Sequence, residues 1–128
     1  MRIIGNGVDI VENQRIKKAI IQKTFIKRIY SISEIRESKK IRNKTNFFAK
    51  RFAAKEAFSK ALGTGIRKGV NLKNIEILND SNGKPLIKLK GNLANFLRKK
   101  IKAKKYYIYL SLSDDKPWAQ ATVIISYN

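Results

Sequence analysis

The chain has 128 residues, 43% of them hydrophobic, with 29 Lys or Arg against 9 Asp or Glu, and it contains neither cysteine nor histidine. This length and composition predict one folded domain over residues 1–128 and argue against a disordered chain. The missing cysteine excludes disulfides and thiolate sites, and the missing histidine excludes the commonest general base. Proton transfer and metal binding must then rest on carboxylates, lysines and tyrosines, which favours a hard cation such as Mg²⁺ over zinc.

The formal net charge of +20 is the strongest compositional signal. It predicts attraction to an anionic partner, which could be a nucleic acid, a membrane surface, a phosphorylated cofactor or an acidic protein. The joint abundance of Lys, Ile and Asn would also follow from codon bias, in which case much of the charge is incidental. No signal-peptide core and no stretch long enough to span a bilayer appears, so we expect a cytoplasmic protein.

Residues 2–11, RIIGNGVDIV, are typical of a buried strand, with apolar residues on both sides of Gly5 and Gly7. Asp9 is the exception, because burying an unneutralised carboxylate is costly. Two interpretations remain open for it: a hydrogen-bonded structural aspartate, or a metal ligand.

Helices are expected next. Residues 13–29 form a basic amphipathic pattern. It places three isoleucines near one face: Ile16, Ile20 and Ile29. Such a helix would dock an acidic partner or nucleic acid, or its charges would simply face solvent. Ser31, with Glu34 three residues later, resembles a capping box that begins a short helix ending at about Lys40.

The stretch 45–65, TNFFAKRFAAKEAFSKALGTG, is the centre of the chain. Strong helix formers without Gly or Pro, followed by Gly63-Thr64-Gly65, predict a long helix that ends at these glycines. Thr45 or Asn46 would supply the N-cap oxygen. One stripe of this helix is apolar and should be buried: Phe48, Phe52 and Leu62.

Polar residues on the same helix point to a site. A neighbouring stripe holds two small residues before a charged pair: Ala49, Ala53, Glu56 and Lys60. The small side chains would let a backbone or a ligand approach the carboxylate. Three further polar residues fall in or beside the apolar stripe, where burial alone would not place them: Arg51, Lys55 and Ser59. The alternative is that Glu56 and Lys60 form only a solvated i,i+4 pair, which contributes about 0.2–0.5 kcal/mol.

The second half of the chain is rich in strand patterns. Four runs pair as two hairpins, residues 75–78 with 86–89 and 106–113 with 118–126. Asn82-Gly83 suits the positive φ values of the first hairpin's turn, and residues 91–104 predict another basic amphipathic helix. We therefore expect an α+β fold in which an antiparallel sheet packs against the long central helix.

Three separated segments carry the unusual polar groups: GVDIVENQRI from residue 7, RFAAKEAFSKALGTGI from residue 51 and NGKP from residue 82. In this order and spacing they resemble the holo-[acyl-carrier-protein] synthases, the small bacterial 4′-phosphopantetheinyl transferases, from about residue 3 to residue 125. The resemblance implies that family's fold and the transfer of phosphopantetheine from coenzyme A to a serine of apo-acyl carrier protein, releasing adenosine 3′,5′-bisphosphate, in fatty acid biosynthesis. It also implies Mg²⁺, a homotrimer with active sites between subunits, and neither nucleic acid nor membrane as a partner.

The resemblance further implies roles for individual residues. Asp9 and Glu56 match metal-ligand carboxylates, and Glu56 or a water molecule at the metal would take the serine proton. Lys60 matches a motif lysine near the pyrophosphate and completes the catalytic pair with Glu56. Arg15 and Arg28 match basic positions that meet the acidic carrier protein. The positions that match the coenzyme A site are Arg51, Lys55, Ser59, Gly63, Gly65, Gly83, Lys84 and Pro85.

Asp114 is the one departure from the family pattern, because a histidine is common at this place. An aspartate there would repel the phosphates of coenzyme A unless Lys116 or another cation compensates. Asp114 leaves open an inactive relative with the same fold. The basic and aromatic side chains leave open a second alternative, a small basic RNA-binding module. The RNA-binding module would use aromatic and basic side chains that pack equally well within a sheet, namely Tyr106, Tyr107 and Tyr109 beside Lys104 and Lys105.

Overall fold

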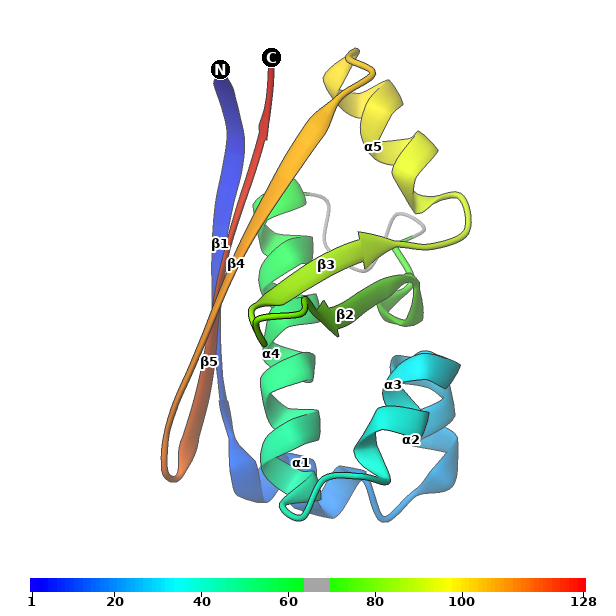
Figure 1. Ribbon diagram of the computed structural model, residues 1–128, viewed down its shortest axis with the longest axis vertical. Coiled ribbons are helices and arrows are strands. Elements are labelled where there is room, and N and C mark those ends of the chain that lie inside the picture. The colour runs from blue at the N-terminus through cyan, green and yellow to red at the C-terminus, as the bar shows by residue number, and fades with distance from the viewer. Residues whose placement is uncertain (64–69) are drawn as a thin grey trace.

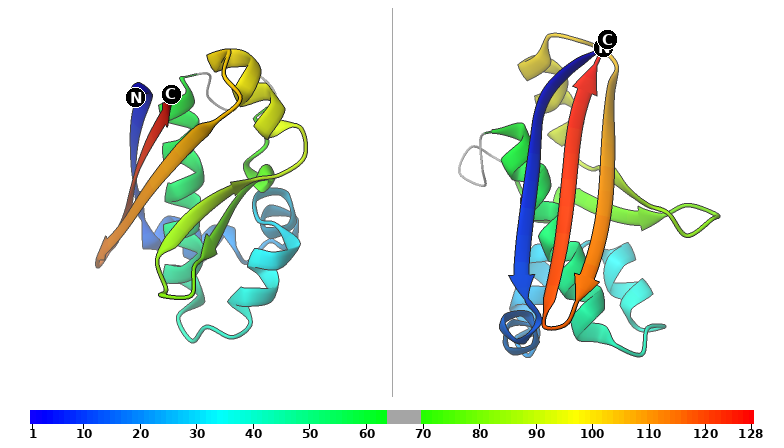
Figure 2. Two further views of the ribbon diagram at one scale, coloured as in Figure 1. Left: turned by 45° about the horizontal axis from the view of Figure 1, so that its top comes forward. Right: turned by 90° about the vertical axis from the view of Figure 1, so that its left-hand side faces the viewer.

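The computed structural model describes residues 1–63 and 70–128 and has an α+β fold (Figure 1). Three strands form one antiparallel sheet in the order β1-β5-β4: β1 (Arg2–Glu12), β4 (Tyr106–Asp115) and β5 (Trp118–Tyr127). The long helix α4 (Lys44–Leu62) lies along one face of this sheet (Figure 2). The prediction of an antiparallel sheet packed against a long central helix is confirmed.

Shorter elements cover α4 on the side away from the sheet (Figure 1). Three helices connect β1 to α4: α1 (Asn13–Ala19), α2 (Lys23–Ile29) and α3 (Ile32–Ser38). After α4 come a 3₁₀ turn and a second antiparallel pair of strands: η2 (Leu72–Asn74), β2 (Ile75–Asn79) and β3 (Pro85–Leu89). Helix α5 (Leu93–Ile101) then leads into β4. The two predicted hairpins thus belong to two separate sheets.

The large sheet and α4 approach closely because β1 presents glycines to the helix. A Cβ atom at Gly7 would overlap the carbonyl oxygen of Ala57, and one at Gly5 would overlap that of Ala61. Only residues without a Cβ permit this approach. The two glycines therefore fix how close the next inward-facing residue of β1, Asp9, comes to α4.

Alternation along the strands gives the large sheet a buried face and an exposed face. The buried face packs on α4 through residues of β5 such as Val123 and Ile125. The exposed face, hereafter the outer face, carries large apolar side chains: Val8, Ile10, Tyr107, Tyr109, Trp118 and Ile124. The prediction that β1 is buried is therefore wrong for this face. Val8 and Ile10 are 51% and 58% exposed, because the described part of the chain places no second layer over them.

The ends of α4 are defined by Asn43 and Gly63. The N-cap is Asn43, whose Oδ1 accepts a hydrogen bond from the backbone N–H of Asn46 at 3.0 Å. The prediction of Thr45 or Asn46 as the cap is wrong, because both residues already lie within the first turn. Gly63 adopts the left-handed conformation with φ 83° and ends the helix, as predicted.

Most of α4 is internal. The helix buries 13 of its 19 residues, among them the predicted stripe of Phe48, Phe52 and Leu62. The polar residues predicted to lie in or beside this stripe are buried as well: Arg51, Lys55 and Ser59. A helix enclosed on nearly all sides is a core helix, so each buried polar side chain on it needs a partner or a function.

The single helix predicted over residues 13–29 is in fact two helices. The backbone turns at Ile20, and Gln22 is extended, with φ −84° and ψ 114°, before α2 begins. In one continuous helix Ile16 and Ile29 would lie roughly 140° apart around the axis, so the prediction that they share a face of a single helix is wrong. The break between α1 and α2 allows both isoleucines to be buried.

Helix α3 begins with the predicted capping box. Ser31 Oγ accepts from the backbone N–H of Glu34 at 3.2 Å, and Glu34 Oε1 accepts from the backbone N–H of Ser31 at 2.8 Å. Helix α5 is shorter than the predicted 91–104 because Lys102 takes a positive φ of 55°. Within residues 1–63 and 70–128, no helix combines the length and apolar character needed to cross a membrane.

Candidate active site

Two carboxylates and a lysine meet where β1 passes α4. The Asp9 side chain is only 14% exposed, and its Oδ1 accepts a hydrogen bond from Lys60 Nζ at 3.0 Å. Lys60 also donates to the carbonyl of Val8 at 3.2 Å. Glu56 lies one helical turn before Lys60, is half-buried and feels the charges of both Asp9 and Lys60. The structure thus brings together Asp9, Glu56 and Lys60.

The electrostatics of this cluster favour a bound cation. Burial raises the pKa of Glu56 above its ordinary value of 4.5, and the charge of Asp9 raises this pKa further. Lys60 and Arg15 act in the opposite direction. A cation between the two carboxylates would remove their repulsion and satisfy Glu56 in its ionised form.

The donor set fits Mg²⁺. No group of three or more acidic side chains capable of holding a metal occurs in the described residues, so Asp9 and Glu56 are two carboxylates without a third. Mg²⁺ is commonly held by one or two protein carboxylates, with waters and substrate phosphates completing an octahedron. A structural zinc site would need four side-chain ligands.

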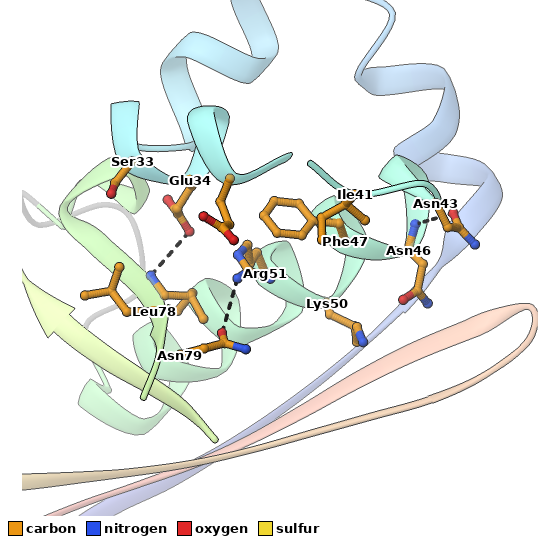
Figure 3. A pocket seen from close by; sticks show the side chains of 12 residues that line it. Ser33, Glu34, Ile41, Asn43, Asn46, Phe47, Lys50, Arg51, Leu78 and Asn79 are labelled. Carbon is orange, nitrogen blue, oxygen red and sulfur yellow. Dashed lines mark hydrogen bonds between the residues drawn. The ribbon is translucent and has the colours of Figure 1, made fainter. Parts of the chain in front are cut away.

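A second group of predicted residues lies on the hairpin side of α4. Arg51 is buried, with its guanidinium carbon 3.7 Å from the centroid of the Phe47 ring. Its Nη2 donates to Asn79 Oδ1 at 3.4 Å (Figure 3), while its Nε has no partner within the described structure. Burial lowers the pKa of Arg51, although its guanidinium stays charged at neutral pH. A buried cation with an unused donor is suited to an anionic ligand.

Two cavities open beside Arg51. The first, hereafter the hairpin pocket, has a volume of about 370 Å³ and lies against the turn between β2 and β3. It brings Arg51 together with the predicted Gly83, Lys84 and Pro85. The second, hereafter the Phe47 pocket, has a volume of about 490 Å³ and is shown in Figure 3. Apolar, amide, basic and acidic side chains line it, including Glu34, Glu37, Ile41, Asn46, Phe47, Lys50, Leu78 and Asn79.

Three other predicted coenzyme A residues line neither of these pockets, namely Lys55, Ser59 and Gly63. Lys55 is fully buried, and its ammonium is surrounded by protein acceptors. Ser59 is buried too, and its hydroxyl donates to the carbonyl of Lys55 at 3.2 Å. Gly63 is the exposed C-cap of α4. Gly65 lies outside the described residues.

The carboxylate cluster and the two pockets use different sides of α4. Arg51 and Glu56 are five residues apart, which turns them roughly 140° around the helix axis, and Lys60 lies roughly 180° from Arg51. One copy of the chain therefore presents the carboxylates on one side of α4 and the cationic pockets on another.

A family model that describes the 4'-phosphopantetheinyl transferase superfamily matches residues 5–122. The chain belongs to this superfamily. It is 49% identical over 125 residues to the holo-[acyl-carrier-protein] synthase of Pelagibacter ubique, with 98% of each chain covered. The crystal structure of the Neisseria meningitidis holo-[acyl-carrier-protein] synthase matches with a TM-score of 0.89 and 37% identity, over 98% of this chain and 100% of that chain. The Bacillus anthracis holo-(acyl-carrier-protein) synthase in complex with CoA (3',5'-ADP) matches with a TM-score of 0.79 and 38% identity, over 96% of each.

The resemblance predicted from the three motifs is therefore confirmed. In this member of the phosphopantetheinyl transferase superfamily, the predicted docking arginines are exposed on different helices. Arg15 lies on α1 with its guanidinium 5.5 Å from the Phe52 ring, where its charge also reaches Glu56. Arg28 lies on α2, beyond the break in the predicted helix. The two residues thus differ in their distance from the carboxylate cluster.

Asp114, the departure from the family pattern, has a defined partner. Its Oδ2 accepts a hydrogen bond from Asn46 Nδ2 at 2.7 Å, and Asn46 lines the Phe47 pocket. The ion pairs found in the described structure do not include one between Asp114 and Lys116. The neighbour that holds this carboxylate is thus an amide on α4, where the sequence suggested Lys116.

Several residues around the pockets were missed by sequence reasoning. Asn46 was read only as a helix cap, and Glu34 only as part of a capping box. Asn79 and Phe47 carried no signal apart from their place after a predicted strand and within a predicted helix. The sequence signal for these partners was a charged residue inside an apolar stripe, because a buried charge requires a polar partner elsewhere in the fold.

Proposed function

We propose that the chain is a holo-[acyl-carrier-protein] synthase that moves the 4′-phosphopantetheine arm of coenzyme A onto a serine of apo-acyl carrier protein. The observation that carries this proposal is the meeting of Asp9, Glu56 and Lys60 on one side of α4, with Arg51 and the turn at residues 83–85 lining a pocket on another. The activity would serve fatty acid biosynthesis in the cytoplasm, as the family resemblance implies.

Each residue of the carboxylate cluster has a role in the transfer. Asp9 and Glu56 would hold Mg²⁺, which when bound supplies positive charge to the pyrophosphate of coenzyme A. The ammonium of Lys60 neutralises the departing phosphate. Glu56 accepts the proton of the serine hydroxyl. The serine oxygen bonds to the phosphorus that carries pantetheine, and the bond from that phosphorus to the leaving adenosine 3′,5′-bisphosphate breaks.

The adenosine end of coenzyme A is assigned to the pockets beside Arg51. Lys50, Arg51 and Lys84 supply positive charge for phosphates, and the backbone at Gly83 allows close approach. The Phe47 pocket offers an apolar wall with amide groups, which suits a nucleobase.

The same proposal includes assembly into a homotrimer with active sites between subunits. Within one copy, the metal side and the pocket side of α4 face apart, so a neighbouring copy has to complete the site. The outer face gives such a neighbour a surface, because soluble monomers rarely expose a large contiguous apolar patch. The tyrosines that an RNA-binding module would use, Tyr107 and Tyr109, lie within this outer face.

Mass spectrometry of apo-acyl carrier protein after incubation with coenzyme A and Mg²⁺ tests the activity. We expect the carrier protein to gain one phosphopantetheine. Asp9→Asn and Glu56→Gln should each slow transfer by about a hundredfold or more. Glu12→Gln, an exposed acid on the same strand, is the matched control. No adduct with the unchanged chain, or full activity in either site variant, would refute the proposal.

Sedimentation velocity tests the assembly. We expect the mass of three copies for the unchanged chain, and Ile10→Glu on the outer face should yield monomers that keep their fold but lose transfer. Leu86→Glu is the matched control, since Leu86 is also exposed and apolar but lies on β3. A monomeric, fully active chain would contradict the shared site.

A further inference from the structure

The ammonium of Lys55 is fully enclosed and fully bonded. It donates to Glu34 Oε1 at 2.7 Å, to the carbonyl of Leu72 at 3.0 Å and to the carbonyl of Ile75 at 2.6 Å. An ammonium has three N–H donors, so none remains for a ligand. The side chains of Lys55 and Glu34 are both 0% exposed. This geometry disagrees with the role of coenzyme A contact that the family resemblance implies for Lys55.

Glu34 extends the contact from α4 to two further elements. Its Oε1 also accepts from the backbone N–H of Ser31 at 2.8 Å, and its Oε2 accepts from the backbone N–H of Ile77 at 3.3 Å (Figure 3). Ser31 Oγ in turn donates to Glu76 Oε2 at 2.6 Å. The resulting buried network joins α3, α4, η2 and β2 through side chains of Ser31, Glu34, Lys55 and Glu76.

Stability alone does not explain a buried ion pair. Desolvating two charges costs about as much as their attraction returns, so apolar residues of similar volume would often serve equally well. A buried pair with fixed acceptors does, however, define a single relative position of the elements that it joins. The network therefore matters through the pocket residues that α4 and β2 contribute.

The network adjoins the Phe47 pocket, which Glu34 lines, and is connected to the hairpin pocket through β2. Strand β2, which the network holds at Ile75 and Ile77, ends at Asn79, the partner of Arg51. The turn that follows β2 supplies Gly83, Lys84 and Pro85 to the same pocket. Arg51 itself lies one helical turn before Lys55 on α4. A displacement of β2 relative to α4 would thus separate the two walls of the pocket.

We propose that Glu34 and Lys55 are positioning residues for the coenzyme A pocket: as a buried ion pair they set β2 and its turn against α4. Glu34 adjoins the Phe47 pocket, but both side chains are fully buried and bonded within the protein, so they act without a polar contact to the cofactor. The inference rests on the proposed function, since it assigns the pocket to coenzyme A. It predicts an effect on cofactor affinity and little effect on the chemical step, because Asp9, Glu56 and Lys60 lie on another side of α4.

Steady-state transfer at saturating Mg²⁺ and carrier protein, with coenzyme A varied, tests the inference. Glu34→Gln and Lys55→Met should each raise KM for coenzyme A by roughly tenfold, while kcat stays within about threefold. The double variant Glu34→Gln/Lys55→Met should lie closer to the unchanged enzyme than Lys55→Met alone, because it leaves no buried charge without a partner.

The matched control is Tyr30→Phe. Tyr30 is fully buried, and its hydroxyl donates to the carbonyl of Phe48 at 2.8 Å, so the variant removes one buried bond near the network without altering the ion pair. We expect its KM for coenzyme A to stay unchanged. An equal rise in KM would mean that any loss of stability loosens the pocket, which would overturn the inference.

The remaining outcomes are equally decisive. If Lys55→Met raises KM while Glu34→Gln does not, or if the two effects are additive in the double variant, Lys55 contacts the cofactor directly and the inference is wrong. Should Glu34→Gln fail to fold, Ser31→Ala, which removes the hydroxyl that bonds Glu76 and caps α3, should raise KM in the same direction by a smaller factor, and an unchanged KM would overturn the inference. Absence of transfer in the unchanged enzyme would instead refute the proposed function.

Discussion

The ammonium of Lys60 lies 3.0 Å from Oδ1 of Asp9, at the place where a cation shared by Asp9 and Glu56 would neutralise the same carboxylate. In the metal-free protein this lysine therefore neutralises part of the negative charge that the metal would otherwise neutralise. Binding of Mg²⁺ would release Lys60 from Asp9 and free it to meet the phosphates of coenzyme A.

Lys60→Met should accordingly separate metal binding from catalysis. Two unit charges 4 Å apart interact by about 1 kcal/mol in water, so removing the competing cation should tighten Mg²⁺ binding roughly fivefold when coenzyme A is absent. Transfer should slow by about a hundredfold, since the leaving phosphate loses its counter-charge. Isothermal titration with Mg²⁺ and steady-state assays measure the two effects, and weaker Mg²⁺ binding would contradict the competition.

The raised pKa of Glu56 has a pH signature in the metal-free protein. Because the folded pKa lies above the unfolded value of 4.5, the unfolded chain ionises first, and stability should fall as pH rises from 4.5 through the folded pKa. Glu56→Gln should abolish this loss. NMR titration of the glutamate carboxyl carbons gives the pKa directly. A proton released on adding Mg²⁺ within the same pH range would link the group to the metal, and a pKa of 4.5 or below would exclude the effect.

Gly7 controls the distance between β1 and α4. Gly7→Ala should lower the free energy of unfolding by about 1–3 kcal/mol, because its methyl group would overlap the carbonyl oxygen of Ala57. The strand can relieve the overlap only by moving away, which carries Asp9 from Glu56 and should weaken Mg²⁺ binding. Asn6→Ala, at an exposed position of the same strand, should change neither property. Urea denaturation and Mg²⁺ titration of both variants decide the matter.

Arg15 and Arg28 should differ in what their charge reversal affects. Arg28→Glu, on α2, should raise KM for the acidic carrier protein in a salt-dependent way and leave Mg²⁺ affinity unchanged. Arg15→Glu should also alter Mg²⁺ affinity, because the Arg15 charge reaches Glu56. Kinetics at two salt concentrations distinguish these effects. Equal Mg²⁺ affinities in the two variants would show that Arg15 serves docking alone.

The hydrogen bond from Asn46 to Asp114 places a carboxylate beside the Phe47 pocket. Asp114→Asn keeps an oxygen acceptor for Asn46 and removes the negative charge, so it should bind coenzyme A several-fold more tightly. Asp115→Asn, exposed and adjacent, removes the same charge and should have a smaller effect. Calorimetric titration with coenzyme A provides the comparison. Weaker binding by Asp114→Asn would mean that the carboxylate contributes a favourable contact.

Local patterns in the sequence predicted the elements whose causes are local. The run from Phe48 to Leu62 specified its helix through composition and a glycine stop, and Ser31 with Glu34 specified the start of α3. The break after Ile20 contains neither Gly nor Pro. It arises because Ile16 and Ile29 both become buried, which is a property of the tertiary packing.

The role of Lys55 likewise depends on tertiary contacts that local sequence patterns do not reveal. A lysine in an apolar stripe has either a ligand or a buried counter-ion as its partner, and the sequence does not distinguish them. Glu34 lies 21 residues away along the chain, and Leu72 and Ile75, whose carbonyls complete the set, lie 17 and 20 residues away. By contrast, the angular separation of Arg51 from Glu56 on α4 follows from helix geometry alone and was available in the sequence.

The burial of α4 on nearly all sides constrains how this protein can change. A helix with a solvated side accepts neutral substitutions there, and these supply much of the stabilising variation that evolution and engineering use. Helix α4 has few such positions, because the residues that fill the core alternate with those that line the pockets and face the carboxylates. Selection for a firmer core and selection for turnover therefore act on the same 19 residues. Sequence changes that preserve both stability and turnover should accumulate in α5, because its outward positions neither fill the core nor line the site.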